Sequence, residues 1–190
     1  HFYAAFFPNF EVGAKAVRQI AQSELNLSML RLSDATETET TFQLSGEEKL
    51  VNLAKKGLNL FGHGEERCML IYGLTGNRAS NRLADRRLAH FVRANHGLTV
   101  KVYLGEAWMK KRFLTPYLRN TLWDLGYALD TLETALPWDR LETARKDILE
   151  TIKGGLQDDN ENVLTFSHIS HVYTNGGSLY ITYLYRRAQD

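Results

Sequence analysis

The chain has 190 residues, enough for one domain with a sizeable hydrophobic core. It carries 23 lysines and arginines against 22 acidic residues, and the net charge of +1 gives no basis for nucleic-acid binding. A single cysteine, Cys68, excludes an internal disulfide, and no apolar run approaches the roughly 20 residues of a membrane span. We therefore expect a globular protein without a transmembrane segment, cytoplasmic or peripheral to a membrane, with its oligomeric state open.

The first part of the chain alternates apolar strands with helices. FYAAFFP, residues 2–8, reads as a strand, Asn9 can cap the helix that follows, and MLRLS, residues 29–33, is a second strand. Residues 34–41 are polar and rich in threonine, so we expect an exposed loop there. A helix is expected over residues 47–61.

A second strand–helix–strand unit follows the first. CMLIYGL, residues 68–74, predicts a buried strand, residues 78–95 an amphipathic helix, and residues 98–104 a returning strand. Two such units commonly pair in one antiparallel sheet with the helices packed mainly on one face, the ferredoxin-like arrangement. The sequence therefore predicts an α+β fold.

The last third of the chain predicts a helix at 116–127, an extended segment at 128–138, a helix at 139–153 and a hairpin within 167–185. No interdomain linker is visible, so residues 1–190 are expected to form a single domain. The chain opens on His1 and enters an apolar strand at once, and we expect it to be a piece of a longer protein.

The predicted hairpin, SHISHVYTNGGSLYITYLY, contains several candidate functional residues. On a strand, the period of two places His171 and Tyr173 on one face and His168 on the other. The two histidines are therefore not expected to share a metal unless a bulge intervenes. Gly176 and Gly177 are expected to supply positive φ angles where the hairpin reverses.

Two arginines lie among apolar residues. Arg31 sits inside MLRLS, and Arg119 sits in PYLRNTLW. Either one could hold a carboxylate or a phosphate in bidentate geometry. The alternatives are an ion pair of Arg31 with Asp34 or Glu37, and a capping or snorkelling role for Arg119.

Four segments together resemble a known family. They are FFPNFEVGAKAVRQIAQ, LRLSDATET, RFLTPYLRNTLWDLGYALDTLETALPWDRL and FSHISHVYTNGGSLYITYLY. In order and separation they are similar to the C-terminal, substrate-side region of FAD-linked oxidases of the vanillyl-alcohol-oxidase type. The similarity is greatest to bacterial relatives of alkyldihydroxyacetonephosphate synthase, and it extends over nearly the whole chain.

The resemblance implies a cap domain built on an antiparallel sheet, which covers a flavin held mainly by an N-terminal domain. Matching motif to motif, it implies that Tyr173 is the catalytic residue, a proton donor or acceptor at the substrate carbon facing flavin N5. It implies substrate-binding roles for Arg31 and Arg119, and for His168 and His171, which precede the tyrosine. FAD is the expected cofactor, but the flavin-binding segment is absent, so the 190 residues alone are expected to be inactive.

Three functions stay open at this point. The first is a cap of a synthase-like enzyme that exchanges an acyl for an alkyl group without net redox change. The second is a cap of an FAD-dependent 2-hydroxyacid oxidase or dehydrogenase of the lactate or glycolate type. The third is a non-catalytic ferredoxin-like binding module. For the first two the expected partners are a small-molecule substrate, with an anionic one as first candidate, and the FAD-binding domain of the same protein.

Overall fold

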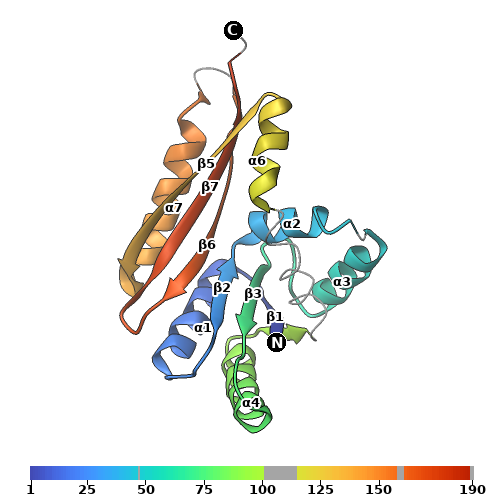
Figure 1. The fold of residues 1–190 in the computed structure, drawn as a ribbon, viewed down its shortest axis with the longest axis vertical. Coiled ribbons are helices and arrows are strands. Elements are labelled where there is room, and N and C mark those ends of the chain that lie inside the picture. The colour runs from blue at the N-terminus through green and yellow to red at the C-terminus, as the bar shows by residue number, and fades with distance from the viewer. Residues whose placement is uncertain (47, 101–114, 158–160, 189–190) are drawn as a thin grey trace.

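The strands of the computed structural model form one antiparallel seven-stranded sheet in the order β4-β1-β3-β2-β6-β7-β5 (Figure 1). The structure describes all residues except 47, 101–114, 158–160 and 189–190. The order of the first four strands is that of the ferredoxin-like arrangement, and the predicted α+β class is confirmed. The strands are β1 Phe2–Phe7, β2 Met29–Ser33, β3 Cys68–Gly73, β4 Leu98–Val100, β5 Tyr127–Pro137, β6 Leu164–Val172 and β7 Gly176–Arg186.

The described helices lie on both sides of this sheet but mainly on one. Helices α1, α4 and α7 cover one face, since Val17 and Leu88 belong to the main core cluster and Leu149 packs with Leu179 of β7. On the other face, Phe42 of α2 and Leu58 of α3 pack on β1 and β3. The helices are α1 Phe10–Gln22, α2 Ala35–Gln43, α3 Glu48–Leu60, α4 Arg78–Ala94, α6 Thr115–Asp124 and α7 Trp138–Gly154.

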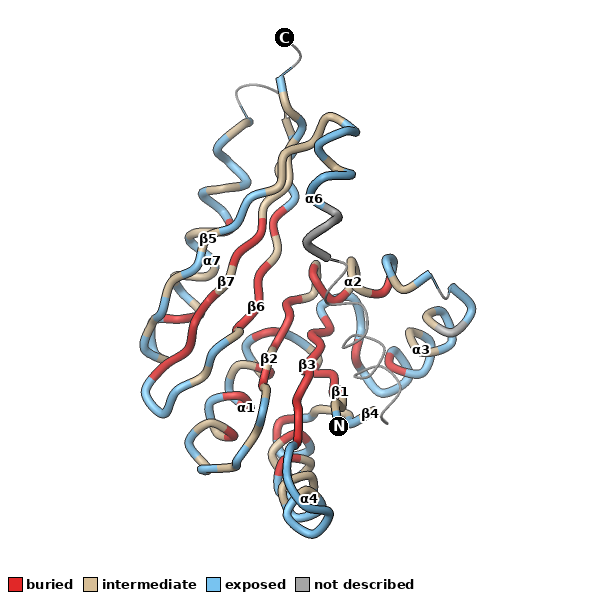
Figure 2. Tube along the Cα trace, viewed as in Figure 1, coloured by how far each residue is buried: buried red, intermediate tan, exposed pale blue. Residues whose placement is uncertain are grey.

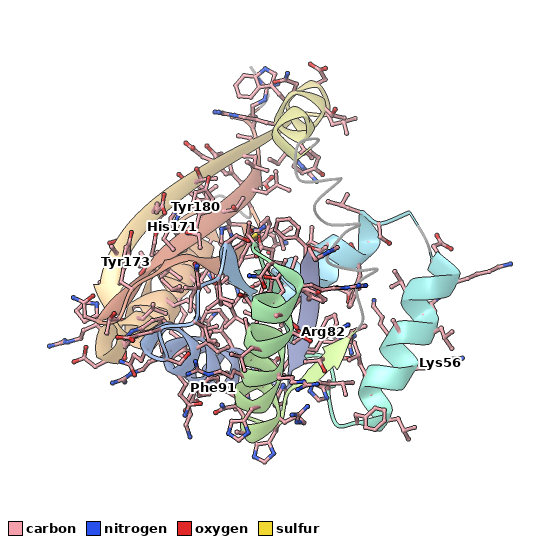
Figure 3. The ribbon with its side chains drawn as sticks, turned by 60° about the horizontal axis from the view of Figure 1, so that its bottom comes forward. Lys56, Arg82, Phe91, His171, Tyr173 and Tyr180 are labelled. Atoms are coloured by element: carbon pink, nitrogen blue, oxygen red, sulfur yellow. The ribbon has the colours of Figure 1, made fainter. Side chains whose placement is uncertain are left out.

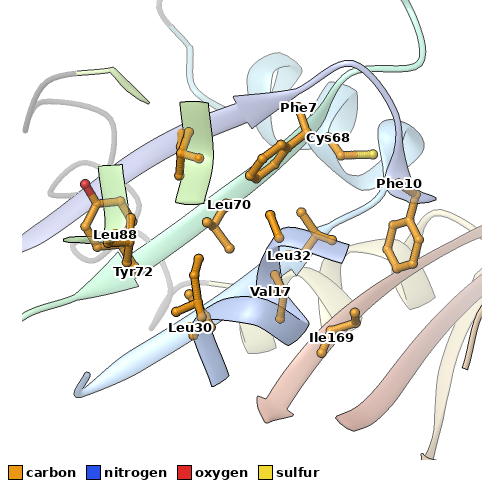
Figure 4. Packing of buried hydrophobic residues seen from close by; sticks show 14 of the residues in the cluster. Phe7, Phe10, Val17, Leu30, Leu32, Cys68, Leu70, Tyr72, Leu88 and Ile169 are labelled. Carbon is orange, nitrogen blue, oxygen red and sulfur yellow. The ribbon is translucent and has the colours of Figure 1, made fainter. Parts of the chain in front are cut away.

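Because helices cover both faces of the sheet at β1, the sequence of this strand is apolar throughout rather than alternating between apolar and polar residues. Ala5 and Phe7 point into the main core beneath α1 and α4, whereas Phe6 points to the opposite face with Met69 and Phe42. A strand buried on both faces has no solvent-facing positions that favour polar residues. Figure 4 shows the main core, and Figure 2 shows that burial is concentrated in the central strands.

Helix α2 contradicts the expected loop at 34–41. Asp34 caps the helix by accepting a hydrogen bond from the backbone N–H of Glu37 at 2.8 Å. The hydroxyl groups of Thr40 and Thr41 donate to carbonyls one turn earlier, and Phe42 is buried against β1. Capping and tertiary burial thus outweigh the modest helix propensity of threonine.

Elsewhere the boundaries follow the predictions closely. Strand β4 begins at Leu98 as expected, and its predicted continuation to residue 104 lies outside the described residues. The segment at 128–138 is extended, as predicted, and forms β5. Gly126, with φ of 84°, separates α6 from β5.

Gly176 and Gly177 serve the hairpin in a way that differs from the prediction. Neither has a positive φ angle; instead, β7 passes unusually close to its neighbours at these residues. A Cβ atom on Gly176 would lie 2.2 Å from the carbonyl oxygen of Leu136, and one on Gly177 would lie 3.2 Å from Ile169 Cγ2. The glycines are needed for close approach to β5 and β6.

We therefore expect Gly176→Ala to lower the free energy of unfolding by about 2–3 kcal/mol, as overpacking against backbone does. Urea unfolding measures the change. Gly154→Ala is the matched control, because a Cβ there meets nothing within 4 Å, and it should change stability by less than about 1 kcal/mol. Equal effects of the two substitutions would contradict the close-approach explanation.

Candidate functional site

The C-terminal part of the sheet has one covered face and one open face. Helix α7 covers the first, where Leu149 packs with Leu179 and Ile181. On the opposite face the described side chains of β5 are exposed at alternate positions, including Thr131 and Glu133. We call this side of β5, β6 and β7, together with the adjoining residues of β2, the open face.

A β-bulge in β6 brings both histidines to the open face. The register passes from Ile169 opposite Leu179 to Val172 opposite Gly177, so β6 has one extra residue. Ile169 and Val172 both pack toward the main core, which leaves His168 and His171 on the other side. The predicted separation of the two histidines was therefore wrong, and the bulge is the reason.

Tyr173 lies on the open face with His171, as predicted. Its side chain is 55% exposed, and Figure 3 shows Tyr173, His171 and Tyr180 following one another along the same side of the strands. The backbone at this position is well anchored: the N–H of Tyr173 donates to the carbonyl of Gly176 at 2.8 Å. The indole Nε1 of Trp138 lies 3.2 Å from the carbonyl oxygen of Tyr173. The exposed phenol of Tyr173 is thus attached to a backbone segment that hydrogen bonds hold in place.

Arg31, Glu37 and His168 form a compact cluster at the edge of the open face. Arg31 Nη2 donates to Glu37 Oε1 at 2.7 Å, and His168 Nδ1 lies 3.1 Å from the same oxygen. Arg31 Nη2 is also 3.0 Å from His168 Nδ1. The alternative of an Arg31–Glu37 ion pair is confirmed.

The charge state of this cluster follows from its contacts. Burial alone raises the pKa of the Glu37 carboxyl, but the charges of Arg31 and His168 outweigh it and bring the pKa to about 2. Glu37 is therefore ionised at neutral pH. The ring of His168 is stacked on that of Tyr180, with centroids 4.9 Å apart.

A second carboxylate, Asp34, links β6 to helix α2 by hydrogen bonds on the covered side of the sheet. Its Oδ2 accepts hydrogen bonds from Ser167 N at 2.6 Å and Ser167 Oγ at 2.8 Å, while its Oδ1 caps α2. Burial raises the pKa of Asp34 to about 6, more than its hydrogen bonds with Glu37 and Ser167 lower it. Asp34 and Glu37 thus hold β6 and β2 in register on opposite sides of the strands.

Arg119 is exposed on α6, which packs on β5. Its contacts in the described part of the chain do not join it to Arg31 or to Tyr173. Arg31 and Tyr173 share the open face of the sheet, and a site that joins all three residues stays a prediction. The role of Arg119 stays a prediction.

Sequence reasoning named Glu37 only as a possible ion-pair partner of Arg31, and it missed Tyr180. Glu37 was placed in a loop, although Asp34 followed three residues later by Glu37 is a signature of a helix N-terminus. Recognising it would have placed the Glu37 side chain on the first turn of α2. Tyr180 could be located only once the register of β6 and β7 was known, because it lies opposite His168.

The bulge also removes the geometric reason against a shared metal ion at the two histidines. Within the described residues, however, no group of three or more His, Cys, Asp and Glu side chains is arranged to hold one. The open face instead offers a phenol, two imidazoles and the Arg31–Glu37 pair. Such groups can donate hydrogen bonds to a bound molecule and move a proton.

The chain matches a known family over its full sequence. The model of the family described as FAD linked oxidases, C-terminal domain matches residues 1–190, and the chain belongs to that family. The resemblance noted from the sequence is thereby confirmed.

The relatives of this chain include alkyldihydroxyacetonephosphate synthases. The chain is 26% identical over 196 residues to the synthase of Dictyostelium discoideum, covering 100% of this chain and 32% of that protein. It is 22% identical over 195 residues to that of Trypanosoma brucei brucei, covering 97% of this chain and 31% of that protein. A solved structure of an alkyldihydroxyacetonephosphate synthase superposes with a TM-score of 0.90 at 28% identity, covering 100% of this chain and 35% of that one.

The chain thus spans about a third of the length of the curated relatives it matches. Their sequences extend well beyond the region shared with it. In the described part of the chain, every helix is too short or too polar to cross a membrane.

Proposed function

We propose that the chain is the substrate-side cap of a longer FAD-dependent enzyme of the alkyldihydroxyacetonephosphate synthase type. In this proposal the open face lies against the flavin and the substrate. The flavin, held mainly by another domain of the same protein, supplies the redox-active ring when bound. The cap binds and orients the substrate and moves a proton at the reacting carbon.

The observation that carries the proposal is the composition of the open face. The covered face of the same strands packs against α7. The open face carries Tyr173, His171 and the cluster of Arg31, Glu37 and His168, and no described helix lies over Tyr173 and His171. A sheet face that only met solvent would carry scattered polar and charged side chains. Polar and aromatic groups gathered on one uncovered face favour contact with a ligand and a second domain.

Each residue has a distinct role in this proposal. The hydroxyl of Tyr173 is the proton donor or acceptor, because it is exposed on an anchored backbone and can reach a bound molecule. His168 and His171 supply further hydrogen bonds to the substrate. Arg31 and Arg119 supply positive charge, which suits the phosphate in the name of the relatives.

The synthase activity can be tested directly on the full-length flavoprotein that contains this chain. We expect it to convert acyl- to alkyldihydroxyacetonephosphate in the presence of a long-chain alcohol. Anaerobic reduction of the flavin by lactate or glycolate, without the conversion, would instead favour a 2-hydroxyacid oxidase or dehydrogenase. The names of the relatives favour the synthase.

A substitution of Arg119 tests the anion-binding role. A bidentate arginine contact is not reproduced by lysine, and a hydrogen bond to a charged group contributes about 1.5–3 kcal/mol. Arg119→Lys should therefore raise KM for a phosphate-bearing substrate roughly ten- to a hundredfold. Arg93→Lys, at an exposed position on α4, is the control and should leave KM unchanged. An unchanged KM in Arg119→Lys would exclude Arg119 from the substrate site.

A further inference from the structure

Glu37 is a buried carboxylate to which the proposed function gives no role. A single oxygen, Oε1, binds both the guanidinium of Arg31 and the imidazole of His168, at 2.7 and 3.1 Å. The carboxylate is nearly inaccessible to solvent, so it cannot bind substrate itself. Whatever it contributes to a site on the open face must act through these two partners.

The contacts of His168 restrict the position of its ring hydrogen. Ionised Glu37 can only accept, and its Oε1 lies 3.1 Å from His168 Nδ1, so a protonated ring donates from Nδ1 to Glu37 and carries its second hydrogen on Nε2. In a neutral ring Nδ1 faces both this acceptor and the Arg31 Nη2 donor at 3.0 Å, and these two contacts favour opposite tautomers. The cluster therefore presents an Nε2–H donor when His168 is protonated.

That donor is accessible from the open face. In the described part of the chain, Nε2 of His168 has no hydrogen-bond partner, and it is not among the enclosed polar atoms. His168 lies opposite Tyr180 in the sheet, and the stacked Tyr180 ring fixes the plane of the imidazole. The ring is thus held at Nδ1 and across its face, while Nε2 remains available.

We propose that Glu37 is a positioning residue that holds His168 so that its Nε2–H donates to an anionic oxygen of the ligand on the open face. This inference rests on the proposed function, since it assigns the ligand chemistry of the same face. Glu37 partly compensates the charge of Arg31. The ligand would therefore meet the oriented N–H of His168 in addition to the reduced positive charge of Arg31. The oxygen belongs to a phosphate or a carboxylate group.

The test measures anion binding to the full-length flavoprotein by isothermal titration with inorganic phosphate and, separately, with acetate. Glu37→Gln keeps the shape of the side chain but removes its charge, which releases the charge of Arg31 and also the hold on His168 Nδ1. We expect the loss of the oriented donor to dominate, so that phosphate binding weakens about tenfold. Glu39→Gln is the matched control on the same helix, because Glu39 pairs with Lys55 and lies outside the cluster. It should bind phosphate as the wild type does.

A pair of substitutions at His168 examines the donor independently of Glu37. The amide nitrogen of glutamine can occupy the place of Nε2, whereas that of asparagine occupies the place of Nδ1. We expect His168→Gln to stay within about threefold of wild-type affinity and His168→Asn to lose about tenfold. If His168 only contributed packing, His168→Gln would not bind phosphate more tightly than His168→Asn.

Each outcome decides the inference. Tighter binding of phosphate than of acetate assigns the oxygen to a phosphate group, and the reverse preference assigns it to a carboxylate. The inference is overturned if the wild type binds neither anion, if Glu37→Gln behaves like Glu39→Gln, or if His168→Gln loses as much as His168→Asn. Turnover of Arg119→Lys and of a Tyr173 variant reports on the proposed function separately, so a failure here leaves those results intact.

Discussion

Replacing Tyr173 by phenylalanine in the full-length flavoprotein should lower kcat about a hundredfold and leave KM nearly unchanged. General acid–base catalysis by a positioned side chain contributes typically 10²–10⁴-fold, and the substitution removes only the hydroxyl. The backbone contacts of Tyr173 with Gly176 and Trp138 do not involve that hydroxyl, so the turn should stay intact. Steady-state kinetics on the alkyl-exchange reaction measures the effect.

A matched control lies on the same strand pair. Tyr185 is on the covered side of β7 by register, and Tyr185→Phe removes the same hydroxyl from a position away from the open face. Its kcat should stay within about twofold of the wild type, as expected for a residue without a role in the chemical step. If Tyr173→Phe behaves in the same way, proton transfer at this face must be assigned to another group.

The sequence predicted most of the sheet because its strands carry strong local signals. The runs around Phe6 and Leu70 are apolar on both faces, and this pattern is typical of strands buried between two helical layers. The pairing order followed from two strand–helix–strand units. Helix α2 was missed because its stability depends on the Asp34 cap and on the contact of Phe42 with β1, which average propensity does not capture.

The candidate site was predictable in its residues but not in its arrangement. Arg31, His168, His171 and Tyr173 stood out by type and by family resemblance. Their faces depended on the bulge between Ile169 and Val172, and a single extra residue moves every following side chain to the other side of a strand. Sequence periodicity does not reveal such a residue when both positions at the bulge are polar.

The ionisation of Asp34 should make stability fall as pH rises through the mildly acidic range. Its pKa of about 6 in the folded chain lies above the ordinary value of 3.8. The folded chain therefore retains a proton that the unfolded chain has already released between about pH 4 and 6. The resulting loss of unfolding free energy is about 3 kcal/mol, at 1.36 kcal/mol for each pKa unit.

Glu37 acts with the opposite sign and in a lower range. Its pKa of about 2 lies below the ordinary value of 4.5, so its contribution to stability is present above about pH 4.5 and is lost as pH falls toward 2. The two carboxylates together predict a stability maximum between about pH 4 and 5. Urea unfolding at a series of pH values from 3 to 7 would locate it.

Asp34→Asn isolates the first of these two contributions. Asparagine can still cap α2 through its amide oxygen, but its amide N–H groups cannot accept from Ser167, so the variant should be less stable at pH 4. It has no proton to release, and the decline in stability between pH 4 and 6 should therefore disappear. Asp139→Asn, at an exposed position in the first turn of α7, should keep the wild-type decline. A decline that persists in Asp34→Asn would mean that another group titrates in this range, and that Asp34 is ionised in the folded chain because its hydrogen bonds outweigh its burial.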